Sequence, residues 1–218
     1  MTGQLVHLRR HGVSVLLDVA GPGVPALLHW GRDLGTDLPV REAWVPPVPH
    51  GTVDEPIPTT LLGGGMASPG LRGSRAGQAW APRWTVDDVA RPDDSSVAVR
   101  CTDAANGLTV STTLVLDAHG VLTVGHVLRN ESPDRYQLDR VAVVLPVPHR
   151  ATELLDMTGR WARERHPQRH QFTAQGTWLR ESRSGRTGHD ATLLLVAGTD
   201  GFGNGRGEVW GAHLAWSG

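Results

Sequence analysis

The chain has 218 residues, which is enough for one all-β domain with a hydrophobic core of its own. Its 21 basic residues nearly balance 22 acidic ones, and a formal net charge of −1 excludes a surface whose main task is to hold nucleic acid or anionic lipid. All of the basic residues are arginine, which excludes a lysine Schiff base and the lysine of a P-loop. A single cysteine, Cys101, excludes an intrachain disulfide framework.

Short segments rich in valine, leucine and threonine, separated by glycine and proline, predict β-strands along most of the chain. The predicted strands cover residues 13–19, 96–101, 108–117, 121–130, 138–147, 191–197 and 208–216. The turn at 117–120 joins two alternating segments, and the glycine-rich stretch 198–207 joins two more, so each predicts a hairpin. Because no window shows helical apolar spacing, we predict an all-β fold, a large antiparallel β-sandwich.

A long irregular insertion interrupts this pattern between Pro39 and Pro82. It carries eight of the fifteen prolines, and a loop of this length in a compact domain is typical of a functional or a disordered segment. Four large apolar residues predict that part of it packs against the rest of the chain: Trp44, Met66, Leu71 and Trp80.

Targeting segments are not evident in the sequence. The first residues contain no apolar stretch of signal-peptide length, and no segment approaches the ~20 apolar residues of a transmembrane helix. We therefore expect a cytoplasmic protein that binds neither nucleic acid nor membrane.

The eight tryptophans allow two interpretations. Indole rings stack on the apolar faces of sugars, which would suit a carbohydrate-binding sandwich, but they also fill cores. The eleven histidines have no carboxylate or cysteine at ligand spacing, so we predict no metal site and no cofactor. The neighbouring acids Asp87–Asp88 and Asp93–Asp94 would point to opposite faces of a strand, which is poor geometry for a retaining glycosidase.

Four motifs, in the right order and spread over most of the chain, resemble glycoside hydrolase family 36, the α-galactosidases. They are W-G-x-D-L-G at residues 30–35, G-x-W-x-R-E at 159–164, S-R-x-G followed by His at 182–189, and G-E-V-W-G at 207–211 with a terminal S-G at 217–218. The arginine- and tryptophan-rich stretch 159–189 contains two of these motifs. Without the resemblance, its arginines and tryptophans allow two interpretations. They form a solvated charge cluster, or they bind an acidic partner or a second subunit.

The resemblance implies that residues 1–218 form a single N-terminal β-supersandwich domain. The family's catalytic barrel, with its two aspartates, would follow Gly218 and is absent from this chain, which is therefore expected to be inactive alone. Its implied roles are to support the barrel of the same protein, to help assemble a homo-oligomer and to supply loop residues to a galactoside pocket.

Implied substrate-binding residues are Trp44, Arg72, Arg183 and His189. Arg72 lies where the family often has a sugar-contacting arginine, whereas the accompanying acid is not identifiable. Implied structural residues are Trp30, Asp33, Trp161, Glu164, Arg165 and Glu208, with Trp161 expected to pack over the Glu164–Arg165 pair and brace the sheet.

Two other functions remain open at the level of sequence. One is a free-standing carbohydrate-binding β-sandwich module, and the other is a self-contained hydrolase that uses histidine and carboxylates. A reading frame that continues past Gly218 into a barrel would favour the α-galactosidase N-terminal domain over both of these functions.

Overall fold

Antiparallel strands dominate the computed structural model, which describes residues 5–21, 23–44, 60–63, 69–172, 176–182, 188–189 and 194–215. The all-β prediction is confirmed, because the described residues form thirteen strands and a single four-residue helix. In chain order the elements are β1 Leu5–Arg10, β2 Val13–Asp18, β3 Ala26–Arg32, α1 Arg41–Trp44, β4 Leu71–Ser74, β5 Thr85–Asp93, β6 Ser96–Asp103, β7 Leu108–Leu116, β8 Leu122–Asn130, β9 Gln137–Val141, β10 Glu153–Arg160, β11 Arg163–Gln171, β12 Leu194–Gly198 and β13 Val209–His213.

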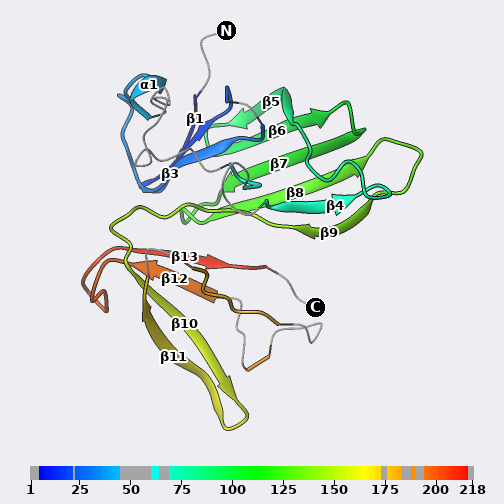
Figure 1. Cartoon of the computed structure of the whole chain (residues 1–218). Helices are drawn as coiled ribbons and strands as arrows, with labels where there is room; N and C mark the ends of the chain where they lie inside the picture. Colours follow the sequence, from blue (N-terminus) through cyan, green and yellow to red (C-terminus); the bar gives the residue numbers. More distant parts are fainter. Residues whose placement is uncertain are drawn as a thin grey trace, which may run out of the picture. The chain divides into compact units, whose positions relative to one another are not determined.

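The chain divides into two compact units, Met1–Pro146 and Val147–Gly218. The first unit contains a three-stranded sheet in the order β1-β2-β3, a four-stranded sheet β5-β6-β7-β8 and a two-stranded sheet β4-β9 (Figure 1). The second unit contains one four-stranded sheet in the order β11-β10-β12-β13.

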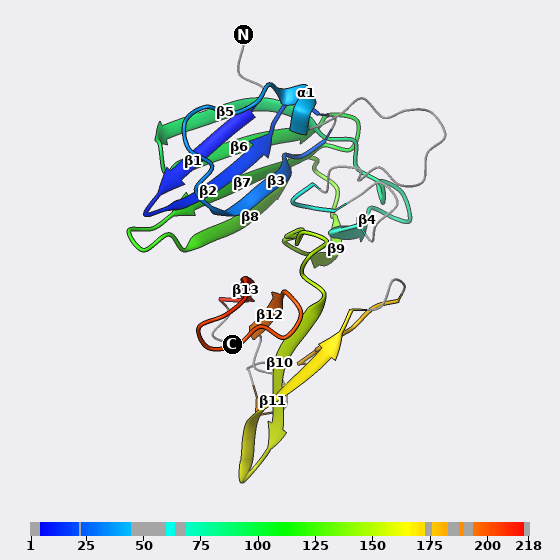
Figure 2. The ribbon, with the colours of Figure 1, turned by 90° about the vertical axis from the view of Figure 1, so that its left-hand side faces the viewer.

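The core of the first unit lies between its two larger sheets, and Figure 2 shows β1–β3 lying over β5–β8. Alternation along each strand decides which side chains enter the core, since neighbouring side chains of a strand point to opposite faces. On β6, Val97, Val99 and Cys101 are all buried, and on β2 the core residues Val15 and Leu17 are fully buried. The β1–β3 sheet therefore has an inner apolar face, and on its other face the β2 residues Ser14, Leu16 and Asp18 are also buried.

Both predicted hairpins are present. β7 and β8 pair in register from Leu108–Asn130 to Leu116–Leu122 around the turn at 117–120. β12 and β13 pair antiparallel across the glycine-rich loop. The predicted strand at 138–147 is shorter in the structure, where β9 ends at Val141.

The described part of the insertion contains α1 and β4 besides irregular segments, and it is anchored. Leu61, Leu62 and Leu71 are buried, as expected for Leu71, whereas Trp80 is 71% exposed and does not anchor it. Gly70 is needed for close approach, because a Cβ there would lie 2.2 Å from the Leu62 carbonyl oxygen. Met66 lies outside the described residues.

The second unit is built around β10, whose two neighbours are β11 and β12. The outer strand β11 is exposed along almost its whole length. Within the described part of the chain, no helix has the length and apolar character needed to cross a membrane.

Candidate functional site

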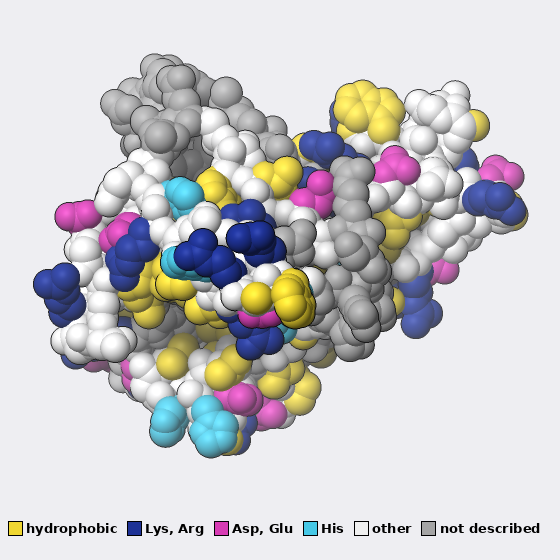
Figure 3. Space-filling model, turned by 90° about the horizontal axis from the view of Figure 1, so that it is seen from below, with side chains coloured by type: hydrophobic (Ala, Val, Ile, Leu, Met, Phe, Trp, Pro, Cys, Tyr) yellow, Lys and Arg dark blue, Asp and Glu magenta, His cyan; other side chains and the backbone are white. Residues whose placement is uncertain are grey.

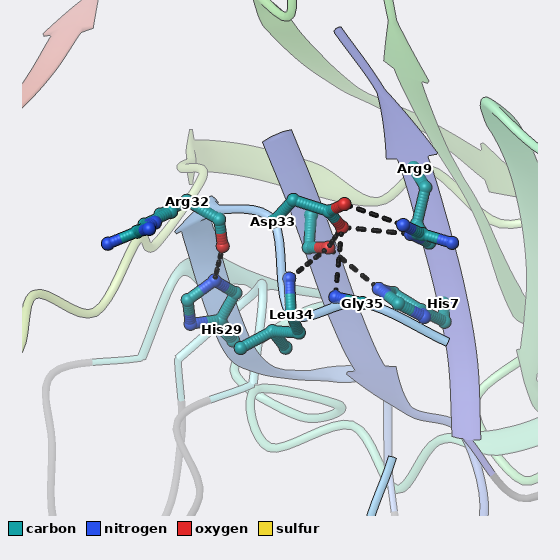
Figure 4. Close-up of polar contacts among 8 residues, drawn as sticks. His7, Arg9, His29, Arg32, Asp33, Leu34 and Gly35 are labelled. Carbon is teal, nitrogen blue, oxygen red and sulfur yellow. Dashed lines mark hydrogen bonds and ion pairs between the residues drawn. The ribbon is translucent and has the colours of Figure 1, made fainter. Parts of the chain in front are cut away.

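Asp33, from the W-G-x-D-L-G motif, is the centre of a polar network on the outer face of the β1–β3 sheet (Figure 4). Arg9 on β1 donates to both carboxylate oxygens, from Nε at 2.8 Å and from Nη2 at 2.6 Å. The hydroxyl of Ser14 on β2 donates to Oδ1 at 2.7 Å, and the Gly35 amide donates to the same atom at 3.3 Å. Register explains the meeting, because Arg9 and Ser14 are directly opposite each other in the β1–β2 pair.

The network also fixes the protonation of His7. Arg9 first, and Ser14 next, lower the pKa of Asp33, so this carboxylate is ionised at neutral pH and can only accept. Ser14 gives its single hydroxyl hydrogen to Asp33 and therefore accepts from His7 Nε2, 2.8 Å away. Burial, followed by the nearby Arg9 charge, lowers the pKa of His7. His7 therefore donates from Nε2, and its lowered pKa favours the neutral imidazole.

A second clamp holds the same segment further along. The carboxylate of Asp18, only 3% exposed at the end of β2, accepts from Arg41 Nε at 2.8 Å and from Arg41 Nη2 at 2.6 Å. Residues 33–44, which we call the strap, are therefore tied to the β1–β3 sheet at their first residue and again within α1. Trp44 is the last residue of the strap.

A polar pocket of about 540 Å³ lies beside the first clamp. Its walls come from β1 and the β1–β2 turn, from the start of the strap and from the β5–β6 turn. The lining residues are His7, Arg9, Arg10, His11, Gly12, Asp33, Thr36 and Asp94.

The cluster contains serine, histidine and aspartate, but it is not a nucleophilic triad. Ser14 is fully buried and sits between the other two groups, whereas a catalytic triad needs the histidine between serine and carboxylate. In the described residues, no group of three or more histidine, cysteine, aspartate or glutamate side chains is arranged to hold a metal ion. The arrangement suits anchoring and binding rather than bond cleavage.

The implied substrate-binding residues are distributed over both units. Trp44 is half-buried, and its indole Nε1 is buried without a hydrogen-bond partner among the described residues. Arg72 is exposed on β4 and lies directly opposite Arg140 on β9. His189, in the second unit, is also exposed, and Arg183 lies outside the described residues. No hydrogen bond or ion pair joins any two of these residues in the described part of the chain, so their assignment stays a prediction.

Two of the implied structural residues have clear contacts in the first unit. Asp33 anchors the strap. Trp30 packs against the core cluster, and its Nε1 donates to the Pro146 carbonyl at 2.5 Å.

The packing expected for Trp161 is not what the structure shows. Trp161 occupies the two-residue turn between β10 and β11, where its side chain is 83% exposed. Its neighbour Ala162 has a positive φ of 65°, and the Ala162 amide donates to Glu164 Oε1 at 2.8 Å. A turn at the end of a hairpin has no sheet beneath it, and the tryptophan therefore projects away from the strands.

An arrangement of the expected kind occurs elsewhere in the second unit. The Arg150 guanidinium lies over the ring of Trp210, 5.0 Å from its centroid, and is paired through Nε with Glu208 Oε2 at 2.5 Å. Trp210 is 8% exposed. Glu208 therefore contacts Arg150, which lies over Trp210, and its structural role stays a prediction.

Sequence reasoning missed Arg9, Ser14, Asp18 and Arg41, which form the two clamps with Asp33. Each ion pair joins residues more than twenty positions apart. The available signal was the alternation of polar residues on β1 and β2, which places Arg9, Ser14 and Asp18 on one face.

The fold and the site together define an all-β domain whose polar clamps secure a long connecting segment. Residues 23–218 match the family model of the glycosyl hydrolase family 36 N-terminal domain, and the chain belongs to that family. It is 38% identical over 176 residues to an α-galactosidase of Escherichia coli, an alignment that covers 79% of this chain and 25% of that protein.

Solved structures agree on the fold. The chain superposes on the α-galactosidase from Lactobacillus brevis with a TM-score of 0.78 at 17% identity, covering 98% of this chain and 33% of that one. For the family 36 α-galactosidase AgaA from Geobacillus stearothermophilus the TM-score is 0.75 at 19% identity, covering 95% and 33%. The chain therefore spans a quarter of the length of the E. coli relative and a third of the length of these solved chains.

Proposed function

We propose that this chain is the non-catalytic N-terminal domain of an α-galactosidase, which supports the catalytic barrel, takes part in oligomer assembly and brings loop residues to the galactoside pocket. The observation that carries the proposal is the family match over residues 23–218, together with the short span of the chain relative to the E. coli α-galactosidase. Retaining hydrolysis needs two facing carboxyl groups about 5 Å apart on a rigid frame. The best-defined carboxylate of the candidate site, Asp33, is occupied by Arg9 and Ser14.

The strap supports the part of the proposal that concerns pocket loops. Its two clamps fix the backbone that leads into Trp44, and a segment held at both ends loses little conformational freedom when it contacts a substrate. Arg72 is held on β4, where the close approach at Gly73 to the Gln137 carbonyl fixes the strand against β9.

The β10–β11 turn supports the part that concerns assembly. An exposed tryptophan among arginines is typical of the centre of a protein interface. Trp161 is flanked by Arg160 and Arg163 in this turn, and all three are exposed. The face drawn in Figure 3 shows basic side chains next to hydrophobic ones.

The experiment compares two arginines in the full-length enzyme that contains this chain. Arg72 and Arg140 are cross-strand partners and both are exposed, so each is the control for the other. If Arg72 donates a charged hydrogen bond to the galactoside, Arg72→Ala lowers kcat/KM about 10- to 100-fold while Arg140→Ala leaves it unchanged. An unchanged kcat/KM in Arg72→Ala would remove Arg72 from the pocket.

The isolated chain and the full-length enzyme together test the rest of the proposal. The 218-residue chain alone should not hydrolyse an aryl α-galactoside, and Trp161→Ser should weaken oligomer assembly, as measured by sedimentation, without lowering the melting temperature of the chain. Turnover by the chain alone that disappears when one of its own acids is replaced would contradict the proposal.

A further inference from the structure

We propose that the pocket beside the Arg9–Asp33 clamp binds a neutral, hydroxyl-rich ligand, a hexose or a short hexose-containing oligosaccharide. The choice of galactose-containing sugars as probes rests on the proposed function, whereas the class of ligand rests on the pocket itself. The pocket volume of about 540 Å³ is in the usual range for small-ligand sites.

The charges of the lining balance. Two guanidinium groups, Arg9 and Arg10, and two carboxylates, Asp33 and Asp94, line the pocket, and Arg9 and Asp33 are already paired with each other. Outside that pair, an anionic ligand would meet the carboxylate of Asp94 and a cationic ligand would meet the guanidinium group of Arg10. Sugar hydroxyls both donate and accept, so a lining with equal numbers of charged donors and acceptors fits them best.

Several of these groups are free to bind a ligand. The side chain of Asp94 is 97% exposed, and its only partner among the described residues is Arg91 Nη2 at 3.4 Å. Arg10 uses Nη1 to contact Ser95 Oγ at 3.1 Å, which leaves its Nε and Nη2 without partners in the described part of the chain. His7 uses Nε2 as a donor, so its Nδ1 is an acceptor.

The walls of the pocket are fixed before any ligand arrives. The Asp33 amide donates to the Gly12 carbonyl at 2.8 Å, which ties the strap to the β1–β2 turn. The Arg9 amide donates to the Asp94 carbonyl at 3.0 Å, which ties the β5–β6 turn to β1. A preorganised pocket needs little further ordering, and this lowers the entropic cost of binding.

The test is an NMR titration of the 218-residue chain with galactose, with raffinose and, separately, with inorganic phosphate. We expect saturable shifts for both sugars on the backbone amides that line the pocket, at residues 9–12, 33–36 and 94. A site that binds through exposed hydrogen bonds should have a Kd on the order of millimolar. Phosphate should cause no saturable shift at these residues.

Asp94→Asn is the variant that tests the site, because its side chain is exposed and the change keeps its size. The loss of one charge-assisted acceptor should weaken sugar binding about 5- to 10-fold. Asp134→Asn is the matched control: Asp134 is an exposed acid in another turn of the same unit, and sugar binding should not change.

Three results would overturn the inference: no saturable shift with either sugar, shifts confined to residues outside the pocket, or saturable binding of phosphate without sugar. Equal sugar affinity in Asp94→Asn and in the parent chain would also overturn it. None of these results bears on the proposed function, because that proposal is measured as turnover and assembly of the full-length enzyme.

Discussion

Removing Arg41 should destabilise the first unit by a predictable amount, because its partner Asp18 is only 3% exposed. Arg41→Ala removes two charge-assisted hydrogen bonds, at 2.8 and 2.6 Å, and leaves a buried carboxylate without a counter-ion. Such losses cost about 3–5 kcal/mol. Asp18 keeps the Ala20 amide as a donor at 3.0 Å, so we expect the lower end of that range, about 3 kcal/mol.

Urea unfolding followed by tryptophan fluorescence measures this change, and the melting temperature should fall by about 6–12 °C. Arg32→Ala is the control, since Arg32 is exposed and its side chain has no hydrogen-bond or ion-pair partner among the described residues. The Asp18→Ala/Arg41→Ala double variant should be more stable than the sum of the single changes predicts, because no charge is then left buried and unpaired. A cost below about 1 kcal/mol for Arg41→Ala, or strict additivity in the cycle, would refute the reasoning.

Four further predictions concern the chain itself. Cys101 should resist a thiol reagent until the chain unfolds, because burial raises the pKa of its thiol to about 12; rapid reaction in native buffer would contradict this. Gly70→Ala should lower the free energy of unfolding by about 1–3 kcal/mol or more, measured in urea, because the new Cβ meets the Leu62 carbonyl. The folded-state pKa of Asp33 is lowered, so its contribution to stability is present above its unfolded-state pKa and is lost as the pH falls from about 5 towards 2; Asp33→Asn should flatten that part of the pH profile of unfolding. Trp161→Ser should leave the unfolding midpoint of the chain unchanged, because the side chain is already 83% exposed.

Strands with short alternating apolar segments between turn residues could be predicted from the sequence. The β7–β8 hairpin is an example, since its alternating apolar residues and its turn specify both strands and their register. β11 could not be predicted in this way. Its sequence, R-E-R-H-P-Q-R-H-Q, contains no apolar alternation, because both faces of this outer strand are exposed and it is held by backbone pairing with β10.

The candidate site was predictable only in part. The motif at 30–35 indicated Asp33 as a candidate. The sequence does not indicate Arg9 as its partner, because 21 arginines and 22 acids allow many pairs. The choice is made by strand register, which places Arg9 opposite Ser14 and both beneath the strap. For Trp161 the motif predicted packing against the sheet. The side chain is exposed instead, because the residue lies in the two-residue turn between β10 and β11.

These observations separate two reasons why a residue of the first unit would matter to an α-galactosidase. Asp33 has both carboxylate oxygens occupied by groups of its own chain, so it would act on a substrate only by holding the strap. Arg72 has no hydrogen-bond or ion-pair partner among the described residues and lies opposite Arg140, a like-charge arrangement that is unfavourable for the strand pair. A residue whose hydrogen bonds are all made within the fold acts through the stability of the fold, whereas an exposed guanidinium without a partner in the described residues has donors left for a group from outside. On this physical criterion Arg72, rather than Asp33, is the residue of the first unit to examine for contact with a galactoside.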